Sequence, residues 1–106
     1  MAIQLRIRET DDGSNDKEVI ALLEHPMHTG MQKDKATGKP IPAHFIQRIV
    51  LEHNGRPVAE AHTGGALAAD PLLTFRLKGA KNGDKVRLSW WDNLKKTETV
   101  EKTVSL

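Results

Sequence analysis

The fold is decided by the stretch FIQRIVLEHNGRPVAEAH, residues 45–62. Its first half is an apolar, β-branched run, which predicts a long strand near the middle of a sheet. Asn54-Gly55 comes next, and Asn-Gly between strand-like runs favours a type I′ hairpin, in which both central residues have positive φ. Pro57 places the returning strand, residues 58–62, at a sheet edge or a strand start. This stretch therefore predicts an antiparallel hairpin.

Strand patterns recur on both sides of the hairpin. Most are period-two alternations, and one is a short apolar run; they occupy residues 3–7, 18–23, 73–77, 86–90 and 100–106. Turn residues separate them, and no helix of ordinary length is convincing. The pattern predicts an all-β fold, an immunoglobulin-like β-sandwich of about seven strands in one domain spanning residues 1–106. The small residues at 63–70 predict a crossing between sheets, or a single helical turn at 66–69.

The same alternation predicts which side chains the sandwich buries. The inter-sheet core is expected to contain Leu73, Phe75, Leu77, Val86, Leu88 and Trp90. In the strand at 45–51, Ile46 and Ile49 fall on opposite faces. Trp91 points away from the core, where it is either a partner contact or covered by the next turn.

Composition excludes several classes of function. The chain has 106 residues and no cysteine, so it holds no disulfide, thiolate nucleophile or cysteine-ligated cluster. Its 16 Lys and Arg residues are interleaved with 14 Asp and Glu residues rather than gathered in one stripe, which argues against nucleic-acid binding. Residues 1–6 alternate and contain no apolar run, so we expect neither a signal peptide nor a membrane span. Taken alone, this predicts a cytoplasmic protein.

Catalysis and metal binding have weak support in the sequence. No serine lies in a Gly-x-Ser-x-Gly context, and the paired carboxylates Asp11-Asp12 lie in a polar turn, so we expect no enzyme and no cofactor. A stand-alone metal-binding sandwich is the alternative: His25, Met27, His28 and Met31 offer imidazole and thioether ligands that suit copper. We favour a simpler interpretation, in which Met27 is buried in the loop and the histidines are partly exposed hydrogen-bonding groups.

The connection between the second and third expected strands is unusually long. Residues 25–46 read HPMHTGMQKDKATGKPIPAHFI, and such connections are usually functional or disordered. Three X-Pro steps, two glycines and a closing aromatic residue indicate an ordered, functional loop. Its charged tip, with Lys33, Lys35 and Lys39 around Asp34, would be able to steer an acidic partner.

This loop and several later motifs resemble one known family. The matching elements, in order, are His25, Met27, Thr29-Gly30, Lys33-Asp34, Gly38-Lys39, Ile41-Pro42, Asn54-Gly55, Ala68-Ala69-Asp70-Pro71 and Trp90-Trp91-Asp92-Asn93. No single element is specific, but the ordered set is similar to the SoxZ family of bacterial sulfur-oxidation proteins. One position departs from the pattern, because His28 stands where the family often has an acidic residue.

The resemblance implies a non-catalytic subunit of the SoxYZ sulfur-carrier complex, with an immunoglobulin-type fold. Its partner would be a SoxY-like chain whose C-terminal cysteine arm carries covalently bound sulfur intermediates during thiosulfate oxidation. Other Sox enzymes would contact the complex transiently. We expect this chain to bind no cofactor and to make no contact with a membrane. The complex would be periplasmic, with this chain co-exported by a signal-bearing partner. The absence of cysteine fits, since a second thiol would compete with the carrier thiol for disulfide formation.

We expect the loop to bind that partner. Met27, Met31, Ile41 and Phe45 would supply or support apolar contact, while Lys33, Asp34 and Lys39 form a polar rim. His25, at the start of the pattern, completes the expected partner-binding set. Apolar members should contribute more than charged ones, because interface energy concentrates in a few buried anchors.

Overall fold

A computed structural model describes residues 2–12, 14–64 and 68–106 and shows seven β-strands. They are β1 (Ile3–Glu9), β2 (Lys17–Leu23), β3 (Ile46–His53), β4 (Arg56–His62), β5 (Leu72–Leu77), β6 (Lys85–Asp92) and β7 (Thr97–Thr103). The described residues contain no helix with the length and hydropathy required to cross a bilayer.

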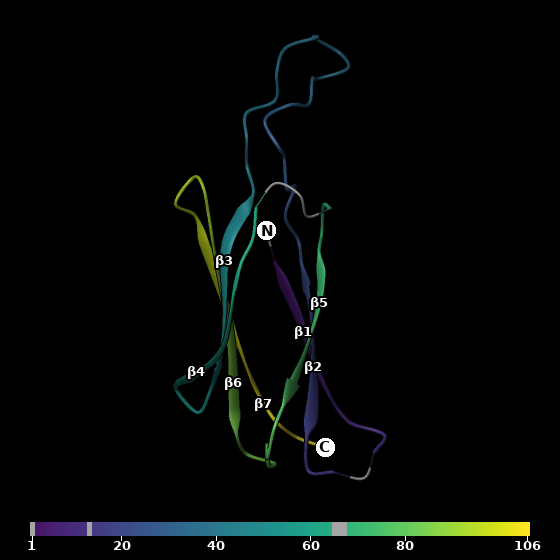
Figure 1. Cartoon of the computed structure of the whole chain (residues 1–106), viewed down its shortest axis with the longest axis vertical. Helices are drawn as coiled ribbons and strands as arrows, with labels where there is room; N and C mark the ends of the chain where they lie inside the picture. Colours follow the sequence, from purple (N-terminus) through teal and green to yellow (C-terminus); the bar gives the residue numbers. More distant parts are fainter. Residues whose placement is uncertain (1, 13, 65–67) are drawn as a thin grey trace.

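The strands form two antiparallel sheets that face each other (Figure 1). One sheet has the order β1-β2-β5, and the other has the order β4-β3-β6-β7. This confirms the predicted immunoglobulin-like sandwich, although β4 pairs with β3 rather than joining the first sheet as in constant-type immunoglobulin domains. The chain crosses from one sheet to the other between β4 and β5, as predicted. For the alternative, a helical turn at 66–69, residues 66 and 67 lie outside the described part of the chain, and residues 68 and 69 are not helical.

The core lies between the sheets and is built from alternate residues of the central strands. The fully buried apolar side chains include Val19 and Leu23 from β2, Ile49 and Leu51 from β3, and Val86, Leu88 and Trp90 from β6. The predicted burial of Trp90 is therefore confirmed. Leu73 and Phe75 pack against this core from the predicted side of their strand, but they are only partly buried. The reason is that β5 is an edge strand paired on one side only.

A β-bulge in β3 overturns the predicted phase of Ile46. The register with β6 shifts between Ile46, opposite Asp92, and Arg48, opposite Trp91, so that Gln47 is the extra residue. An extra residue resets the period-two alternation. Ile46 and Ile49 consequently both face the core, with 0% and 1% of their surface exposed.

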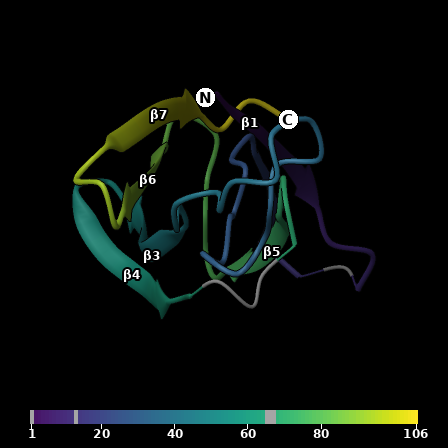
Figure 2. The same ribbon diagram turned by 90° about the horizontal axis from the view of Figure 1, so that it is seen from above.

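The two lateral sides of the sandwich differ. On one side β1 and β7 lie next to each other, and Lys102 Nζ donates a hydrogen bond to the Leu5 carbonyl at 3.2 Å (Figure 2). On the other side the backbones of β4 and β5 make no close contact. The sandwich is therefore closed along one side and open along the other.

Truncation of a core leucine should be far more costly than truncation of a surface leucine. Leu88 is 0% exposed in β6, whereas Leu72 in β5 is 65% exposed. We expect Leu88→Ala to lower the free energy of unfolding by about 2–5 kcal/mol, through lost burial and a residual cavity. Leu72→Ala should change it by less than about 0.5 kcal/mol. Urea denaturation followed by circular dichroism measures both, and equal effects would contradict the assigned core.

Candidate partner-binding loop

Residues 24–45, here called the projecting loop, connect β2 to β3 and extend beyond the ends of both sheets (Figure 1). The two arms of the loop run antiparallel. His28 and His44 exchange two backbone hydrogen bonds of 2.7 and 2.9 Å, and Ile41 N donates to the Gln32 carbonyl at 2.8 Å. The projecting loop is therefore an ordered irregular hairpin, and all of residues 31–40 are exposed.

Asp34 shapes the tip of the projecting loop. Its carboxylate Oδ1 accepts hydrogen bonds from Ala36 N at 2.8 Å and Thr37 N at 3.3 Å, and its carbonyl accepts one from Gly38 N at 2.7 Å. Such an Asx turn satisfies backbone donors that have no other partner. Three exposed lysines, Lys33, Lys35 and Lys39, outnumber this one carboxylate, so the tip carries a net positive charge.

Gly30 allows the two arms to approach closely. Its φ is +88°, a left-handed backbone conformation that residues other than glycine rarely adopt. A Cβ at this position would lie 3.1 Å from the Cβ of Ala43 on the opposite arm. Both the backbone geometry and the limited space therefore favour glycine at position 30.

His25 anchors the root of the projecting loop inside the protein. Its Nδ1 accepts a hydrogen bond from Met27 N at 3.1 Å, so Nε2 carries the proton and donates to Asp92 Oδ2 at 3.1 Å. The imidazole packs edge-on against Trp90, with ring centroids 5.0 Å apart. Asp70 holds the His25 backbone, since its Oδ1 accepts from His25 N and its N donates to the His25 carbonyl.

The β6–β7 turn fastens the returning arm. His44 Nε2 lies 2.7 Å from the same Asp92 Oδ2, while Asp92 Oδ1 accepts backbone hydrogen bonds from Leu94 and Lys96 at 2.9 Å each. The side-chain amide of the adjacent Asn93 binds the same arm through two hydrogen bonds of 2.8 Å. Its Oδ1 accepts from Phe45 N, and its Nδ2 donates to the Ala43 carbonyl. Both arms are thus fixed to one turn far away in the sequence.

The buried pair has well-defined protonation states. Burial lowers the pKa of His25 below its usual value, and the hydrogen bond to Asp92 only partly opposes this effect. Burial acts to raise the pKa of Asp92, but hydrogen bonds from His25, the Lys96 amide and His44 outweigh it, so the pKa lies below the usual range. The pair is therefore a neutral imidazole donating to a carboxylate.

The structure separates the expected partner-binding residues into two groups. His25 and Met27 are buried, 1% and 2% exposed, and Met27 Sδ accepts a hydrogen bond from Ile46 N at 3.4 Å. Met31 is 90% exposed. The remaining members are exposed or half-buried along the projecting loop: Lys33, Asp34, Lys39, Ile41 and Phe45. The first group can act on a partner only by supporting the loop, whereas the second is accessible.

The four residues of the copper alternative do not converge. His25 points toward Asp92, Met31 is exposed, and His28 Nδ1 lies 3.3 Å from the Gln32 side chain. The structure instead brings potential ligand atoms of His25, His44 and Asp92 within 4.8 Å of one another. The Met27 amide occupies the free lone pair of His25, which leaves Nε2 protonated and unsuitable for coordination. In this structure the three side chains form a hydrogen-bond network.

Sequence reasoning missed the residues that hold the projecting loop. Asp70, Asp92 and Asn93 appeared in the matching motifs, but their contacts with His25 and with residues 43–45 were not foreseen. Asp92 lies 67 residues from His25, and nothing in local spacing indicates such a contact. The available signal was that the Asp92-Asn93 turn and the loop motifs occurred together in one ordered pattern.

Protonation of His25 should destabilise the fold. The folded-state pKa of His25 is lowered, so as the pH falls the unfolded chain takes up the proton first, and stability present above pH about 6.5 is lost below it. His25→Gln keeps a polar group but cannot titrate. The stability advantage of wild type over His25→Gln should therefore shrink between pH about 7.5 and about 5.5 in urea denaturation. If this advantage grows on acidification instead, the expected direction of the pH dependence is wrong. His62→Gln, which changes an exposed histidine, is the control: the difference in stability between wild type and this variant should not change over the same pH range.

Comparison with known proteins identifies the family. The family model described as sulphur oxidation protein SoxZ matches residues 6–103, which include all of the projecting loop and its anchors. No curated protein matches the chain. The match covers nearly the whole sandwich and agrees with the ordered motifs of the sequence. The chain belongs to the SoxZ family of sulphur oxidation proteins.

Proposed function

We propose that this protein is the non-catalytic subunit of a SoxYZ-type sulfur carrier. In this role it binds a SoxY-like chain whose cysteine arm carries sulfur intermediates during thiosulfate oxidation. The observation that carries the proposal is the family match over residues 6–103. Support comes from the absence of cysteine, which leaves the partner's thiol without a competitor in this chain.

The accessible part of the projecting loop is the surface proposed to contact the partner. It presents an exposed thioether at Met31, with half-buried Ile41 and Phe45 lower on the same loop. Lys33, Asp34 and Lys39 surround the tip as a polar rim. A protruding apolar residue bordered by charges is the usual arrangement of an interface anchor and its rim. The loop is ordered by its own hydrogen bonds, so binding requires little additional ordering.

The proposed role also determines the compartment. The other Sox enzymes, with which the complex would make transient contact, act in the periplasm. We propose that this chain reaches the periplasm folded, together with a signal-bearing SoxY-like partner. The proposed role involves neither a cofactor nor contact with nucleic acid or membrane.

Co-expression tests the proposal. The wild-type chain should co-elute with the SoxY-like chain of the same organism in size-exclusion chromatography and support thiosulfate-dependent cytochrome reduction with the remaining Sox proteins. A charge introduced at Met31 should weaken the complex at least about tenfold, as expected for an interface anchor. Met31→Asp is therefore compared with wild type by titration calorimetry.

Leu106→Asp is the matched control. Leu106 is 49% exposed and lies at the end of the molecule opposite the projecting loop (Figure 1). This variant should bind as wild type does. A chain that never co-elutes with the SoxY-like protein, or that the cytochrome assay does not require, would refute the carrier role. Equal weakening by both variants would refute the loop as the contact surface.

A further inference from the structure

Among the described residues, β5 is paired with a neighbouring strand along one edge only. Its register with β2 runs from Leu22 opposite Leu72 to Lys17 opposite Leu77, and Leu23 N donates to the Pro71 carbonyl at 3.0 Å. In an antiparallel ladder only alternate residues bond to the neighbouring strand. Pro71 and every second residue after it bond to β2. The main-chain N–H and C=O groups of the residues between them, Leu72, Thr74 and Arg76, therefore point away from β2, along the open side of the sandwich.

The β5 edge lacks the protection that two other edges have. At the β1 edge, the Lys102 ammonium occupies the carbonyl of Leu5. The β4 edge has Pro57, which offers no N–H, and a register shift beside it. The register of β5 is unbroken from Leu72 to Leu77, and the strand contains no proline. Three alternating donor–acceptor pairs therefore have no partner strand within residues 2–12, 14–64 and 68–106, and they can pair with another strand.

Two surface hollows flank this edge. The inner hollow lies between the sheets, and five of its eight lining residues are apolar. These are Leu51 of β3, Val58 and Ala59 of β4, and Phe75 and Leu77 of β5, and the polar members are His53, Arg76 and Lys78. Val58 is 49% exposed there. Because side chains of a strand alternate between faces, a strand added to β5 would direct every second side chain toward this hollow. Apolar side chains fit it.

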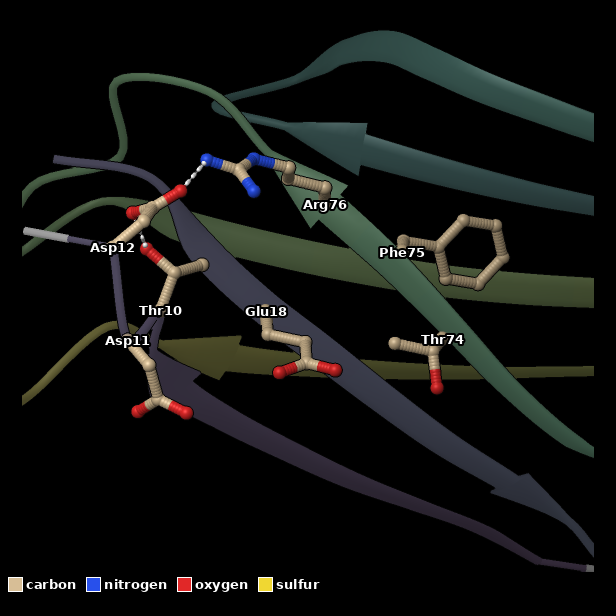
Figure 3. A pocket seen from close by; sticks show the side chains of 7 residues that line it. All are labelled: Thr10, Asp11, Asp12, Glu18, Thr74, Phe75 and Arg76. Atoms are coloured by element: carbon tan, nitrogen blue, oxygen red, sulfur yellow. Dashed lines mark hydrogen bonds and ion pairs between the residues drawn. The ribbon is translucent and has the colours of Figure 1, made fainter. Parts of the chain in front are cut away.

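The outer hollow, on the opposite face of β5, is acidic (Figure 3). Asp11, Asp12 and Glu18 line it, with Arg76 as the one cation among the lining residues. Figure 3 shows Asp12 bonded to Arg76, with the Asp11 and Glu18 carboxylates turned away from that pair. Glu18 accepts a hydrogen bond from Arg8 at 2.7 Å, so Asp11 is the lining carboxylate without a cation partner among the described residues. The other half of the added side chains would lie over this hollow, where basic groups complement the charge.

We propose that the free edge of β5 binds an extended segment of a partner polypeptide in which apolar and basic residues alternate. The segment adds a fourth strand to the β1-β2-β5 sheet. The backbone ladder provides affinity, while the apolar inner hollow and the acidic outer hollow select the side chains. The β5 edge belongs to neither arm of the projecting loop, so this binding site is independent of the proposed carrier role.

A peptide binding experiment on the intact chain tests the proposal. The probe is an acetylated peptide of about seven residues, a usual strand length, in which valine alternates with lysine. The control peptide alternates valine with glutamate. In nuclear magnetic resonance titrations with hydrogen exchange, the lysine peptide should protect the amides of Leu72, Thr74 and Arg76, whereas the glutamate peptide should not. Equal binding of both peptides, or protection confined to other strands, would overturn the proposal.

Backbone and charge variants sharpen the test. Thr74→Pro removes one outward N–H that β2 does not use, and it should weaken binding about tenfold, whereas Thr74→Ala, which keeps the N–H, should not. Asp11→Lys should weaken binding at least about threefold at low salt, and Glu98→Lys, the same change on the other sheet, should not. If Thr74→Pro fails to fold, the Asp11→Lys comparison decides alone. Concentration-dependent protection of the same amides without peptide would mean that a second copy occupies the edge, and would also overturn the proposal.

Discussion

The buried Asp92 carboxylate is the interaction on which the loop-bearing end of this protein depends. One oxygen accepts from the side chains of His25 and His44, and the other accepts from the backbone of Leu94 and Lys96. A charge removed from water in this way is tolerable only because all four donors are in place. Removing any donor would leave a desolvated charge incompletely satisfied, so the end of β2, the returning arm of the loop and the β6–β7 turn hold together as a unit.

This network explains how a long, exposed loop stays ordered on a small domain. Residues 31–40 are all exposed, so the arms derive their order from hydrogen bonds to each other and from the anchors at their root. The root also carries costs: the indole Nε1 of Trp90 is buried without a hydrogen-bond partner among the described residues, and Met27 has a φ of +52°. Such costs concentrate at functional sites, where surrounding packing maintains a strained geometry.

The sequence predicted the fold class because the strands and turns of a sandwich each have a recognisable local sequence pattern. Period-two alternation, the Asn54-Gly55 hairpin signal and the turn residues between strands indicated seven strands, and Trp90 was placed correctly in the core. The same counting failed for Ile46, where a bulge resets the phase. It gave the correct side for Phe75 but not the extent of its burial, which depends on the position of β5 at a sheet edge. Pro57 pointed to the edge position of β4, but nothing in the local pattern indicated the bulge in β3 or the edge position of β5.

For the candidate site, the sequence by itself determined the long loop, its glycines and charged tip, and its resemblance to one family. Tertiary structure alone decided that His25 and Met27 support the loop from within while Met31 is exposed. It also decided that Asp70, Asp92 and Asn93 hold the arms, and that β5 keeps an open edge. These properties arise from contacts between residues tens of positions apart, whose hydrogen bonds exist only after the sheets have paired. Their donors and acceptors are visible in the sequence, but their partners are not.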